Sequence, residues 1–271
     1  LTADKDTWSY DFGWWFQNAA MQGMEWKVPQ FTTHRANAEN IVGRMATHGH
    51  EDHICSLQYL RRELSCPLYG SAVTIGLARN RIEEAGLLGR TDLVVVKDGE
   101  RRMIGPFDVE FIPVTHSVPH ADAIAVHTPQ GVVLHTGDFK LDLTPVDGRR
   151  TDLARIGQIA AAEGIRLLMA DSTNAEEKGY SPSESSVGAV LRNVFAEQTG
   201  RRVITTSFAS HLHRIQQIAD AAIASGRVVA TLGLSMKKNV RLGRDLGVLS
   251  IPDKSLIDID DIDKYPHEKV C

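Results

Sequence analysis

The chain has 271 residues, of which 42% are hydrophobic and 24% are charged, as is usual for a globular protein of one large or two moderate domains. The formal net charge of −4, from 30 basic and 34 acidic residues, argues against nucleic-acid binding through bulk positive charge. No apolar run approaches the roughly 18–20 residues of a membrane span, and no secretory signal is visible, so we expect no membrane partner. Three cysteines without a C-x-x-C pair favour a reducing, cytoplasmic location.

Residues 1–46 differ in character from the rest of the chain. All four tryptophans lie in this segment, and neither strand alternation nor helical periodicity extends over it. Only the stretch from Ile41 to Thr47 has the pattern of a buried strand. We therefore treat residues 1–46 as an atypical N-terminal segment.

Three histidines and two carboxylates follow that strand within six residues, in the sequence THGHEDH at residues 47–53. Imidazole nitrogens and carboxylate oxygens are common ligands of zinc and similar divalent ions. Residues two apart in an extended segment point the same way, so one turn can direct His48, His50 and Asp52 together. Asp52 and His53 are neighbours that can face different ions. The pattern predicts two metal ions, one held by His48 and His50 and the other by Asp52 and His53. Glu51 lies outside it and suits a supporting role.

Beyond the loop, apolar spacing predicts a helix that begins at the metal loop and carries Ile54, Leu57, Leu60 and Leu64 on one face. The patterns then predict a strand at 67–69, a helix at 75–85, strands at 92–96 and 107–114, and a hairpin formed by 123–127 and 132–136. Many strands with few helices indicate a β-sandwich covered by helices.

Two further candidate ligands directly follow strands. His116 comes after the strand at 107–114, and Asp138 comes after the second hairpin strand. A site for two metals needs more ligands than the loop supplies, so we predict both as metal ligands. His135 is expected to be a core residue or to orient a ligand, whereas His34, His120 and His127 are expected to be solvated.

From Asp152 onward, strands alternate with helices, which predicts a parallel sheet with right-handed crossovers and a domain boundary near residue 180. The SPSE sequence at 181–184 reads as a capping box that opens a helix. Strands are expected at 167–170, 203–206 and 228–232. The DSTN sequence at 171–174 is either a functional segment or an N-cap and turn.

Hydroxyl groups follow two of these strands. Ser207 and Ser210 lie where one strand gives way to a helix, and Ser235 lies at the corresponding end of the next strand. Backbone N–H groups at a helix start attract anions, and His213 or Arg214 could add charge. Ser207, Ser210, His213 and Ser235 are the residues from which we predict a phosphate pocket at the edge of the sheet.

The segments THGHEDHI, VTHSVP, HTGDFKLD, ADSTN and SFASHLHR resemble, in order and approximate spacing, those of the ribonuclease J family. This family is a β-CASP branch of the metallo-β-lactamase superfamily, and the resemblance covers residues 47–271. It implies an α/β fold, with a metallo-β-lactamase αββα sandwich at 47–180 and a partial β-CASP domain at 181–271. The family's later histidines would lie beyond Cys271, so we expect a truncated chain.

The resemblance also implies the activity. It implies a metal-dependent ribonuclease, both 5′-to-3′ exonuclease and endonuclease, acting in RNA processing, including that of ribosomal RNA, and in RNA decay. Its two ions would be zinc, or else manganese or magnesium, sharing a hydroxide that attacks phosphorus. His116 would complete one ligand set, Asp138 would bridge both ions, and Asp52 and Asp138 would be catalytic. The phosphate pocket would hold the RNA 5′-monophosphate, and the full-length family is expected to form homodimers or larger assemblies.

Two other functions remain open. One is a thioesterase-like hydrolase of small molecules with the same fold, which would need no second α/β region. The other is an inactive RNA-binding module with an incomplete metal site. Measured metal content and RNA digestion would separate the three.

Overall fold

The computed structural model describes residues 2–3, 6–11, 31–59, 65–90 and 92–271, which form two compact units. The first unit contains Leu1–His116, His120–Lys140 and Thr151–Glu177, and the second contains Ser117–Pro119, Leu141–Arg150 and Lys178–Cys271. Within the described ranges, no helix is both long and apolar enough to cross a membrane.

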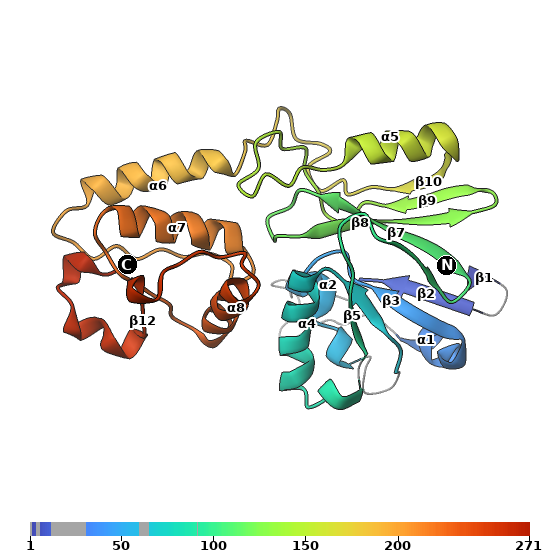
Figure 1. The fold of residues 1–271 in the computed structure, drawn as a ribbon, viewed down its shortest axis with the longest axis horizontal. Coiled ribbons are helices and arrows are strands. Elements are labelled where there is room, and N and C mark those ends of the chain that lie inside the picture. Colours follow the sequence, from blue (N-terminus) through green and yellow to red (C-terminus); the bar gives the residue numbers. More distant parts are fainter. Residues whose placement is uncertain (1, 4–5, 12–30, 60–64, 91) are drawn as a thin grey trace. The chain divides into compact units, whose positions relative to one another are not determined.

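The first unit contains two five-stranded sheets (Figure 1). One has the order β1-β2-β3-β4-β5 and is parallel except for the β1–β2 pair. Its strands are β1 (Thr2–Ala3), β2 (Asp6–Tyr10), β3 (Ile41–Met45), β4 (Leu68–Gly70) and β5 (Leu93–Val95). The other has the order β10-β9-β8-β7-β6, in which only the β10–β9 pair is parallel. Its strands are β6 (Arg101–Ile104), β7 (Phe107–Val114), β8 (Ala121–Thr128), β9 (Gly131–His135) and β10 (Ile165–Met169).

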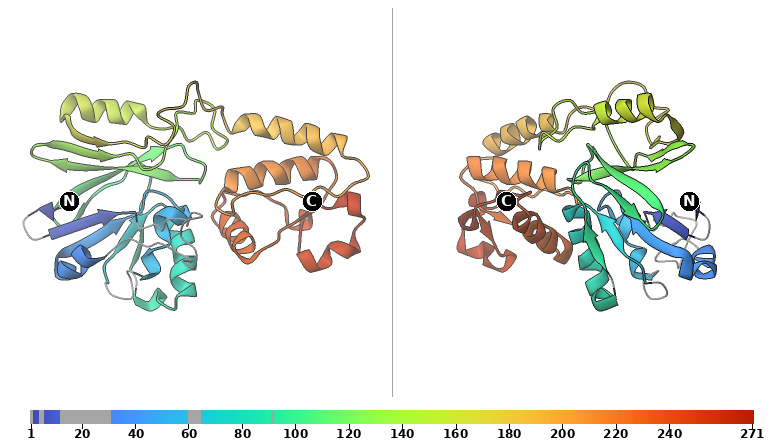
Figure 2. Two further views of the ribbon diagram at one scale, coloured as in Figure 1. Left: turned by 180° about the vertical axis from the view of Figure 1, so that it is seen from behind. Right: turned by 45° about the vertical axis from the view of Figure 1, so that its right-hand side comes forward.

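Helices cover the outer faces of the two sheets. The helices of this unit whose bounds lie within the described residues are α1 (Thr32–Ala36), α2 (Glu51–Ile54), α4 (Ala72–Glu84) and α5 (Leu153–Ala162), with 3-10 turns η1 (Ala38–Asn40) and η2 (Leu88–Arg90); residues 57–59 are also helical. Figure 1 shows α4 beside β5 and α5 along β9 and β10, and Figure 2 shows the same layers from behind. The unit therefore has the α/β sandwich architecture expected from the sequence.

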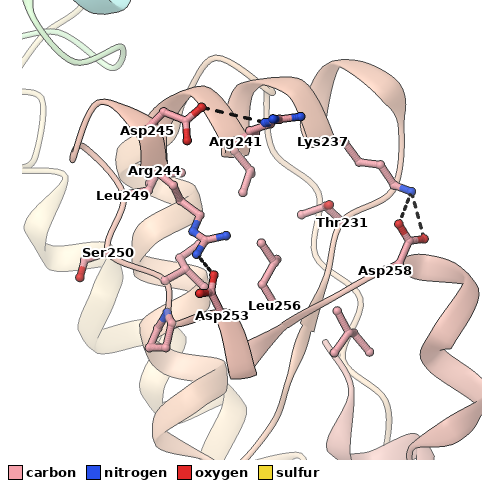
Figure 3. A pocket seen from close by; sticks show the side chains of 14 residues that line it. Thr231, Lys237, Arg241, Arg244, Asp245, Leu249, Ser250, Asp253, Leu256 and Asp258 are labelled. Atoms are coloured by element: carbon pink, nitrogen blue, oxygen red, sulfur yellow. Dashed lines mark hydrogen bonds and ion pairs between the residues drawn. The ribbon is translucent and has the colours of Figure 1, made fainter.

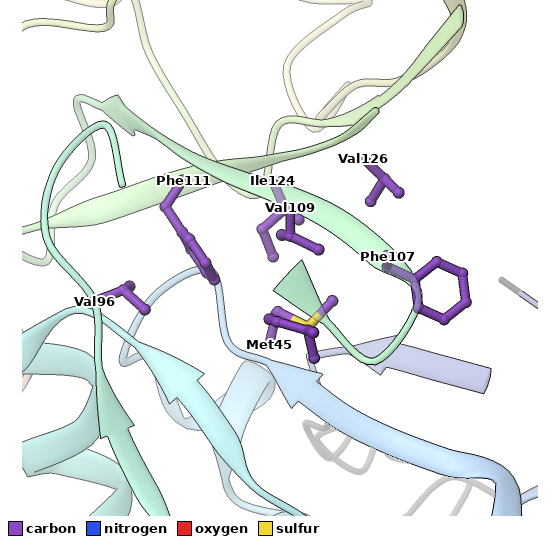
Figure 4. Close-up of a cluster of buried hydrophobic side chains, with 8 residues drawn as sticks. Met45, Val96, Phe107, Val109, Phe111, Ile124 and Val126 are labelled. Atoms are coloured by element: carbon purple, nitrogen blue, oxygen red, sulfur yellow. The ribbon is translucent and has the colours of Figure 1, made fainter. Parts of the chain in front are cut away.

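The core between the sheets is built from alternating inward side chains. Met45 of β3 packs there against residues of β7 and β8, among them Val109, Phe111 and Ile124 (Figure 4). A second buried cluster lies on the other face of β7, β8 and β9, where Ile159 of α5 packs against it. The central strands of the second sheet are therefore covered on both faces, which explains why β8 is buried along almost its entire length.

The second unit is smaller and mainly helical. Its elements are α6 (Ser185–Glu197), α7 (Leu212–Ala224), β11 (Val229–Ala230), α8 (Leu234–Asp245), η3 (Asp253–Ser255), β12 (Leu256–Ile257), η4 (Ile259–Lys264) and η5 (His267–Lys269). Strands β11 and β12 pair in parallel, and α8 lies between them in the chain. Helices α6 and α7 pack together, as Figure 2 shows.

Several predicted elements differ from those in the structure. The helix expected after the metal loop is interrupted, because α2 ends at Ile54 with Cys55 as its C-cap, and residues 57–59 are helical again after a two-residue turn; Leu60 and Leu64 lie outside the described residues. The expected strand at 203–206 has no strand assignment, and the one at 228–232 is shortened to two residues. The segment 1–46 was expected to lack a further strand, yet β2 pairs in parallel with β3. Trp14, Trp15 and Trp26 lie outside the described residues.

The predicted capping box at 181–184 is also wrong. Helix α6 begins at Ser185, so Pro182 is not in its first turn. Ser183 instead accepts a hydrogen bond from the Ser185 N–H at 3.2 Å and donates one to the Thr144 carbonyl at 2.8 Å. Glu184, the acidic member of the predicted box, accepts hydrogen bonds from Arg214 of α7 at 2.5 and 2.9 Å, so its carboxylate is directed to a distant segment and not to the start of α6.

A buried ion network attaches α5 to the second sheet. Arg155 of α5 donates two hydrogen bonds, at 2.6 and 2.9 Å, to the buried carboxylate of Glu110 on β7. His127 on β8 lies 3.0 Å from Glu110 and 2.8 Å from Glu163. The expectation that His127 is solvated is therefore wrong, because it is buried between two carboxylates.

This network predicts a pH-dependent contribution to stability. Burial alone would raise the pKa of Glu110, but hydrogen bonds from Arg155 and His127 outweigh burial and hold the pKa below its ordinary 4.5. We expect Glu110→Gln to lower the free energy of unfolding by about 2 kcal/mol at pH 7. Because the native pKa is the lower one, this difference should shrink as the pH falls below 4.5, when the native carboxylate also takes up a proton. Urea unfolding of wild type and Glu110→Gln between pH 3 and 7 measures this difference in unfolding free energy.

The matched control is Glu197→Gln, at an exposed position at the end of α6. It should change the unfolding free energy little at any pH. A difference between wild type and Glu110→Gln that stays constant from pH 3 to pH 7 would show that the Glu110 charge does not stabilise the fold.

Candidate metal centre

The histidine-rich loop lies at the carboxyl end of β3. Thr47 and His48 are fully buried, and the Thr47 carbonyl accepts a hydrogen bond from the Asp122 N–H at 2.9 Å. His50 is the N-cap of the short helix α2, whose first turn places Asp52 and His53. The chain thus changes from extended to helical between His50 and Glu51. Because of this change, the pair His48 and His50 and the pair Asp52 and His53 face different directions.

The first group of ligand atoms contains three histidine nitrogens and one carboxylate oxygen. His50 Nδ1 lies 3.2 Å from His48 Nε2 and 3.0 Å from His116 Nε2. Asp138 Oδ2 lies 3.9 Å from both His48 Nε2 and His116 Nε2. One atom from each of these residues falls within 4.8 Å of all the others. The structure therefore brings together residues that are up to 90 positions apart in the sequence.

The electrostatics of this group favour neutral rings. Burial lowers the pKa of His48 well below 6.5, and the positions of His53 and His116 lower it further. Burial and the neighbouring His50 lower the pKa of His116 to about 3. Neutral imidazoles offer lone pairs, and three such nitrogens cannot all donate to one another. A divalent cation between them would accept a lone pair from each, so the donor set fits such an ion.

A second group lies beside the first and is richer in carboxylate. His53 Nε2 is 3.7 Å from Asp52 Oδ2 and 3.5 Å from Asp138 Oδ1. Burial alone would lower the pKa of His53, but hydrogen bonds to Asp11 and Asp138 outweigh it and raise the pKa to about 10. Asp138 presents one oxygen to each group, which is the arrangement of a bridging carboxylate.

Asp11 is the site residue that the sequence patterns missed. It follows β2, accepts hydrogen bonds from the Thr47 N–H at 2.8 Å and the Thr47 hydroxyl at 2.7 Å, and lies 2.9 Å from His53 Nδ1. By engaging Nδ1, Asp11 leaves His53 Nε2 free to face the ligand groups. Asp11, His48 and His53 also form a second set of grouped ligand atoms. Asp11 is a single aspartate outside any motif, and the strand before it has no recognisable sequence pattern, so the sequence alone does not identify it as a site residue.

Two neighbouring residues shape the centre without joining it. His135 Nδ1 accepts a hydrogen bond from the Gly137 N–H at 3.0 Å and so holds the turn that carries Asp138. Glu51 pairs with Arg81 of α4, which is a supporting role.

The DSTN segment at 171–174 forms a turn, because Asp171 Oδ1 accepts hydrogen bonds from the N–H and hydroxyl of Thr173.

The four candidates for a phosphate pocket lie in the second unit. Ser207 donates to the Phe208 carbonyl at 3.3 Å, Ser210 precedes α7, and Ser235 is in the first turn of α8. His213 is nearly buried, and its Nε2 lies 3.3 Å from Asp147 Oδ2. Burial would raise the pKa of Asp147, but the hydrogen bond from His213 outweighs it and lowers the pKa. The ring of His213 therefore already has a carboxylate partner in this unit.

A hollow of about 780 Å³ lies beside α8 in the same unit (Figure 3). Three cations of α8 line it, but Lys237 pairs with Asp258 at 3.1 Å, Arg244 pairs with Asp253, and Arg241 lies 4.0 Å from Asp245. The charges balance, so this hollow offers no net attraction for phosphate. Its ion pairs instead tie α8 to the segment 253–258.

Comparison with known proteins gives two family matches. Residues 23–176 match the model of the metallo-beta-lactamase superfamily, and residues 200–271 match that of the ribonuclease J beta-CASP domain. A crystal structure of a protein of unknown function from Enterococcus faecalis has a TM-score of 0.67 at 17% identity, over 95% of this chain and 69% of that chain. This likeness concerns the fold alone.

Curated relatives named Ribonuclease J are more similar in sequence. The Helicobacter pylori (strain J99) protein is 37% identical over 261 residues, which cover 96% of this chain and 37% of the relative. The Thermus thermophilus protein is 39% identical over 267 residues, covering 96% and 46% respectively. A Synechocystis protein is 41% identical over 249 residues, covering 91% and 39%. The chain therefore spans less than half the length of these relatives.

The position of Asp11 predicts a role in metal affinity. Asp11→Asn keeps the size of the side chain but removes the charge that orients His53, so affinity for the ion nearest His53 should fall by about 10–100-fold. Isothermal titration calorimetry with Zn²⁺ measures both binding steps. Asp6→Asn, on the preceding strand, is the matched control and should leave both steps unchanged. Unaltered affinities in Asp11→Asn would refute the role of Asp11.

Proposed function

Since this chain belongs to the metallo-β-lactamase superfamily, and within it to the ribonuclease J family, we propose that it hydrolyses the phosphodiester bonds of RNA with the help of divalent metal ions. One observation carries the proposal. Nitrogens of His48, His50 and His116 converge with Asp138, and the other oxygen of Asp138 faces His53. No other group of described residues combines so many metal-binding atoms in one place.

We assign the candidate ligand residues to two ions by the distances between their nitrogen and oxygen atoms. His48, His50, His116 and Asp138 would hold the first, and Asp52, His53 and Asp138 would hold the second. The nitrogen-rich first group suits zinc, with manganese or magnesium as alternatives at the more carboxylate-rich second group. Divalent ions in such a site supply Lewis acidity, which lowers the pKa of water and offsets charge on the phosphate oxygens.

The side chains themselves supply positioning and proton handling. The side chain of Asp52 is half exposed, so its carboxylate can accept a hydrogen bond from an attacking water and orient it toward phosphorus. Asp138, which is one third exposed, fixes the separation of the two ligand groups through its two oxygens. Asp11, which accepts a hydrogen bond from the Thr47 N–H, contacts Nδ1 of His53 on the side away from the ligand groups, so the ligand geometry is largely formed in advance.

We assign the substrate preference to the second unit. Ser207, Ser210 and Ser235 lie at or just before the starts of α7 and α8, where helix N–H groups attract anions, and with His213 they would receive the 5′-monophosphate of RNA. The proposed activities are 5′-to-3′ exonuclease and endonuclease action in RNA processing and decay. The proposed setting is the cytoplasm, within a homodimer or larger assembly.

Metal content tests the ligand assignment. Wild-type protein dialysed against zinc should retain two ions per chain, His50→Ala one, and Asp138→Asn neither, because Asp138 contributes to both groups. Inductively coupled plasma mass spectrometry measures the ratio. His120→Ala, a half-buried histidine that is not in either ligand group, is the control. If Asp138→Asn kept both ions, Asp138 would not bridge them.

RNA digestion tests the activity. Metal-loaded protein should degrade a 5′-monophosphorylated RNA faster than its 5′-triphosphorylated form, and Asp138→Asn should lower the rate by roughly 10²–10⁴-fold. Denaturing gels of end-labelled RNA measure both rates, with Asp261→Asn, a half-exposed residue of η4 outside both ligand groups, as the control. The ribonuclease proposal fails if protein that holds two ions leaves both RNAs intact. If the two RNAs are cut equally, the monophosphate pocket alone is rejected.

A further inference from the structure

The hydroxyl of Thr151 joins the two chain segments that carry His116 and Asp138. It accepts a hydrogen bond from the Thr115 N–H at 2.9 Å and donates one to the Lys140 carbonyl at 2.9 Å. Thr115 directly precedes His116, and Lys140 lies two residues after Asp138. One side chain therefore connects the backbones beside two candidate metal ligands, although it belongs to neither ligand group.

The hydroxyl takes the place of one bond of a β-bridge. Thr115 and Lys140 form an isolated antiparallel bridge, in which the Lys140 N–H donates to the Thr115 carbonyl at 2.9 Å. In a hydrogen-bonded antiparallel pair the two residues exchange both N–H···O bonds. Here the second connection, from the Thr115 N–H to the Lys140 carbonyl, runs through the Thr151 hydroxyl. The hydroxyl therefore sets the spacing of the two segments.

Thr151 is itself held in place. The next residue, Asp152, donates its N–H to the Pro113 carbonyl at 3.0 Å. Asp152 is also the N-cap of α5, and its side chain accepts a hydrogen bond from the Arg155 N–H at 2.9 Å. The Thr151 hydroxyl is carried by a branched Cβ, which restricts rotation of the side chain. The hydroxyl is therefore a fixed point on the first unit.

A fixed point is needed here because the chain leaves the first unit directly after Lys140. Residues 141–150 belong to the second unit, where Asp147 Oδ2 lies 3.3 Å from His213 Nε2. The chain returns to the first unit at Thr151. The hydroxyl thus closes the base of this excursion, and it keeps the segment before Lys140 attached to the first unit.

We propose that Thr151 is a positioning residue of the metal centre, which holds His116 and Asp138 at the separation that an ion needs. The inference rests on the ligand assignment of the proposed function. Both residues belong to the histidine-rich group, whereas only Asp138 also faces His53. Loss of the hydroxyl therefore weakens binding of the first ion more than binding of the second.

Two substitutions isolate the hydroxyl. Thr151→Val keeps the branched shape and removes both hydrogen bonds, whereas Thr151→Ser keeps the hydroxyl. The matched control is Thr128→Val, because the Thr128 hydroxyl accepts a hydrogen bond from the Gln130 N–H at 3.2 Å and donates one to the Gly131 carbonyl at 2.6 Å. It lies at the turn of the β8–β9 hairpin, at the other end of β9 from Asp138.

Competition for Zn²⁺ with a chromophoric chelator measures the affinities. We expect Thr151→Val to lower the affinity for the first ion by about 10–100-fold, and Thr151→Ser and Thr128→Val to stay near wild type. The second ion is measured by itself in the His50→Ala background, where adding Thr151→Val should cost less. A merely structural role would lower the melting temperature without this difference between the two ions.

Three results would overturn the proposal. One is a Thr151→Val protein whose zinc affinities match those of Thr128→Val. Another is a loss in Thr151→Ser as large as that in Thr151→Val, and the third is an equal loss for both ions. If wild type binds no zinc, the proposed metal centre is rejected together with this role of Thr151; if wild type binds two ions, a failure concerns Thr151 alone.

A measurement on wild type keeps the test valid if Thr151→Val does not fold. Coupling between two equilibria is reciprocal, so an ion that depends on the Thr151 hydrogen bonds must also stabilise them. Zinc should therefore slow amide hydrogen exchange of the Thr115 N–H, followed by NMR, more than that of the Gln130 N–H, which bonds to the control hydroxyl. Equal slowing of the two amides would contradict the proposal.

Discussion

The close approach of Thr47 and Gly137 is the constraint on which the metal centre depends. A Cβ atom at residue 137 would lie 2.8 Å from the Thr47 Cβ, and Gly137 has a φ of +57°, so only glycine fits this turn without strain. Thr47 lies two residues after β3 of one sheet, and Gly137 lies two residues after β9 of the other. Because they touch, the loop that carries His48 and His53 lies directly beside Asp138. The Asp122 N–H, bonded to the Thr47 carbonyl, fixes the same junction from a second strand.

The centre that results has two chemically different halves. His48, His50 and His116 are neutral because burial and mutual repulsion lower their pKa values, and they supply nitrogen lone pairs. His53 has a raised pKa because Asp11 and Asp138 flank it, and the exposed carboxylate of Asp52 completes this half. A divalent cation would replace the proton that the carboxylates now favour on His53. We therefore expect the nitrogen-rich half to bind its ion more tightly, because it is more buried and needs no proton release.

The sequence predicted most of this centre because its ligands lie in short motifs or directly after strands. His48, His50, His116 and Asp138 converge as the motif spacing and the strand ends required. Asp11 could not be found in this way, since its partners Thr47 and His53 are 36 and 42 residues away and its own strand showed no pattern. The SPSE motif misled because Glu184 lies before the first residue of α6 and its carboxylate accepts hydrogen bonds from the distant Arg214. Residues 203–206 have a strand's composition, yet no backbone hydrogen bond joins them to another segment within the described ranges, and composition alone does not show whether a partner strand lies alongside.

The central claim is that Asp138 joins two metal ions into one site, and electron paramagnetic resonance of Mn²⁺-loaded protein tests it most directly. Two Mn²⁺ ions bridged by a carboxylate at about 3.5–4 Å should give the spectrum of an exchange-coupled pair. Asp138→Asn should lose the coupled signal, whereas Asp261→Asn should retain it. A wild-type spectrum of isolated Mn²⁺ ions, at full loading of two ions per chain, would contradict the account.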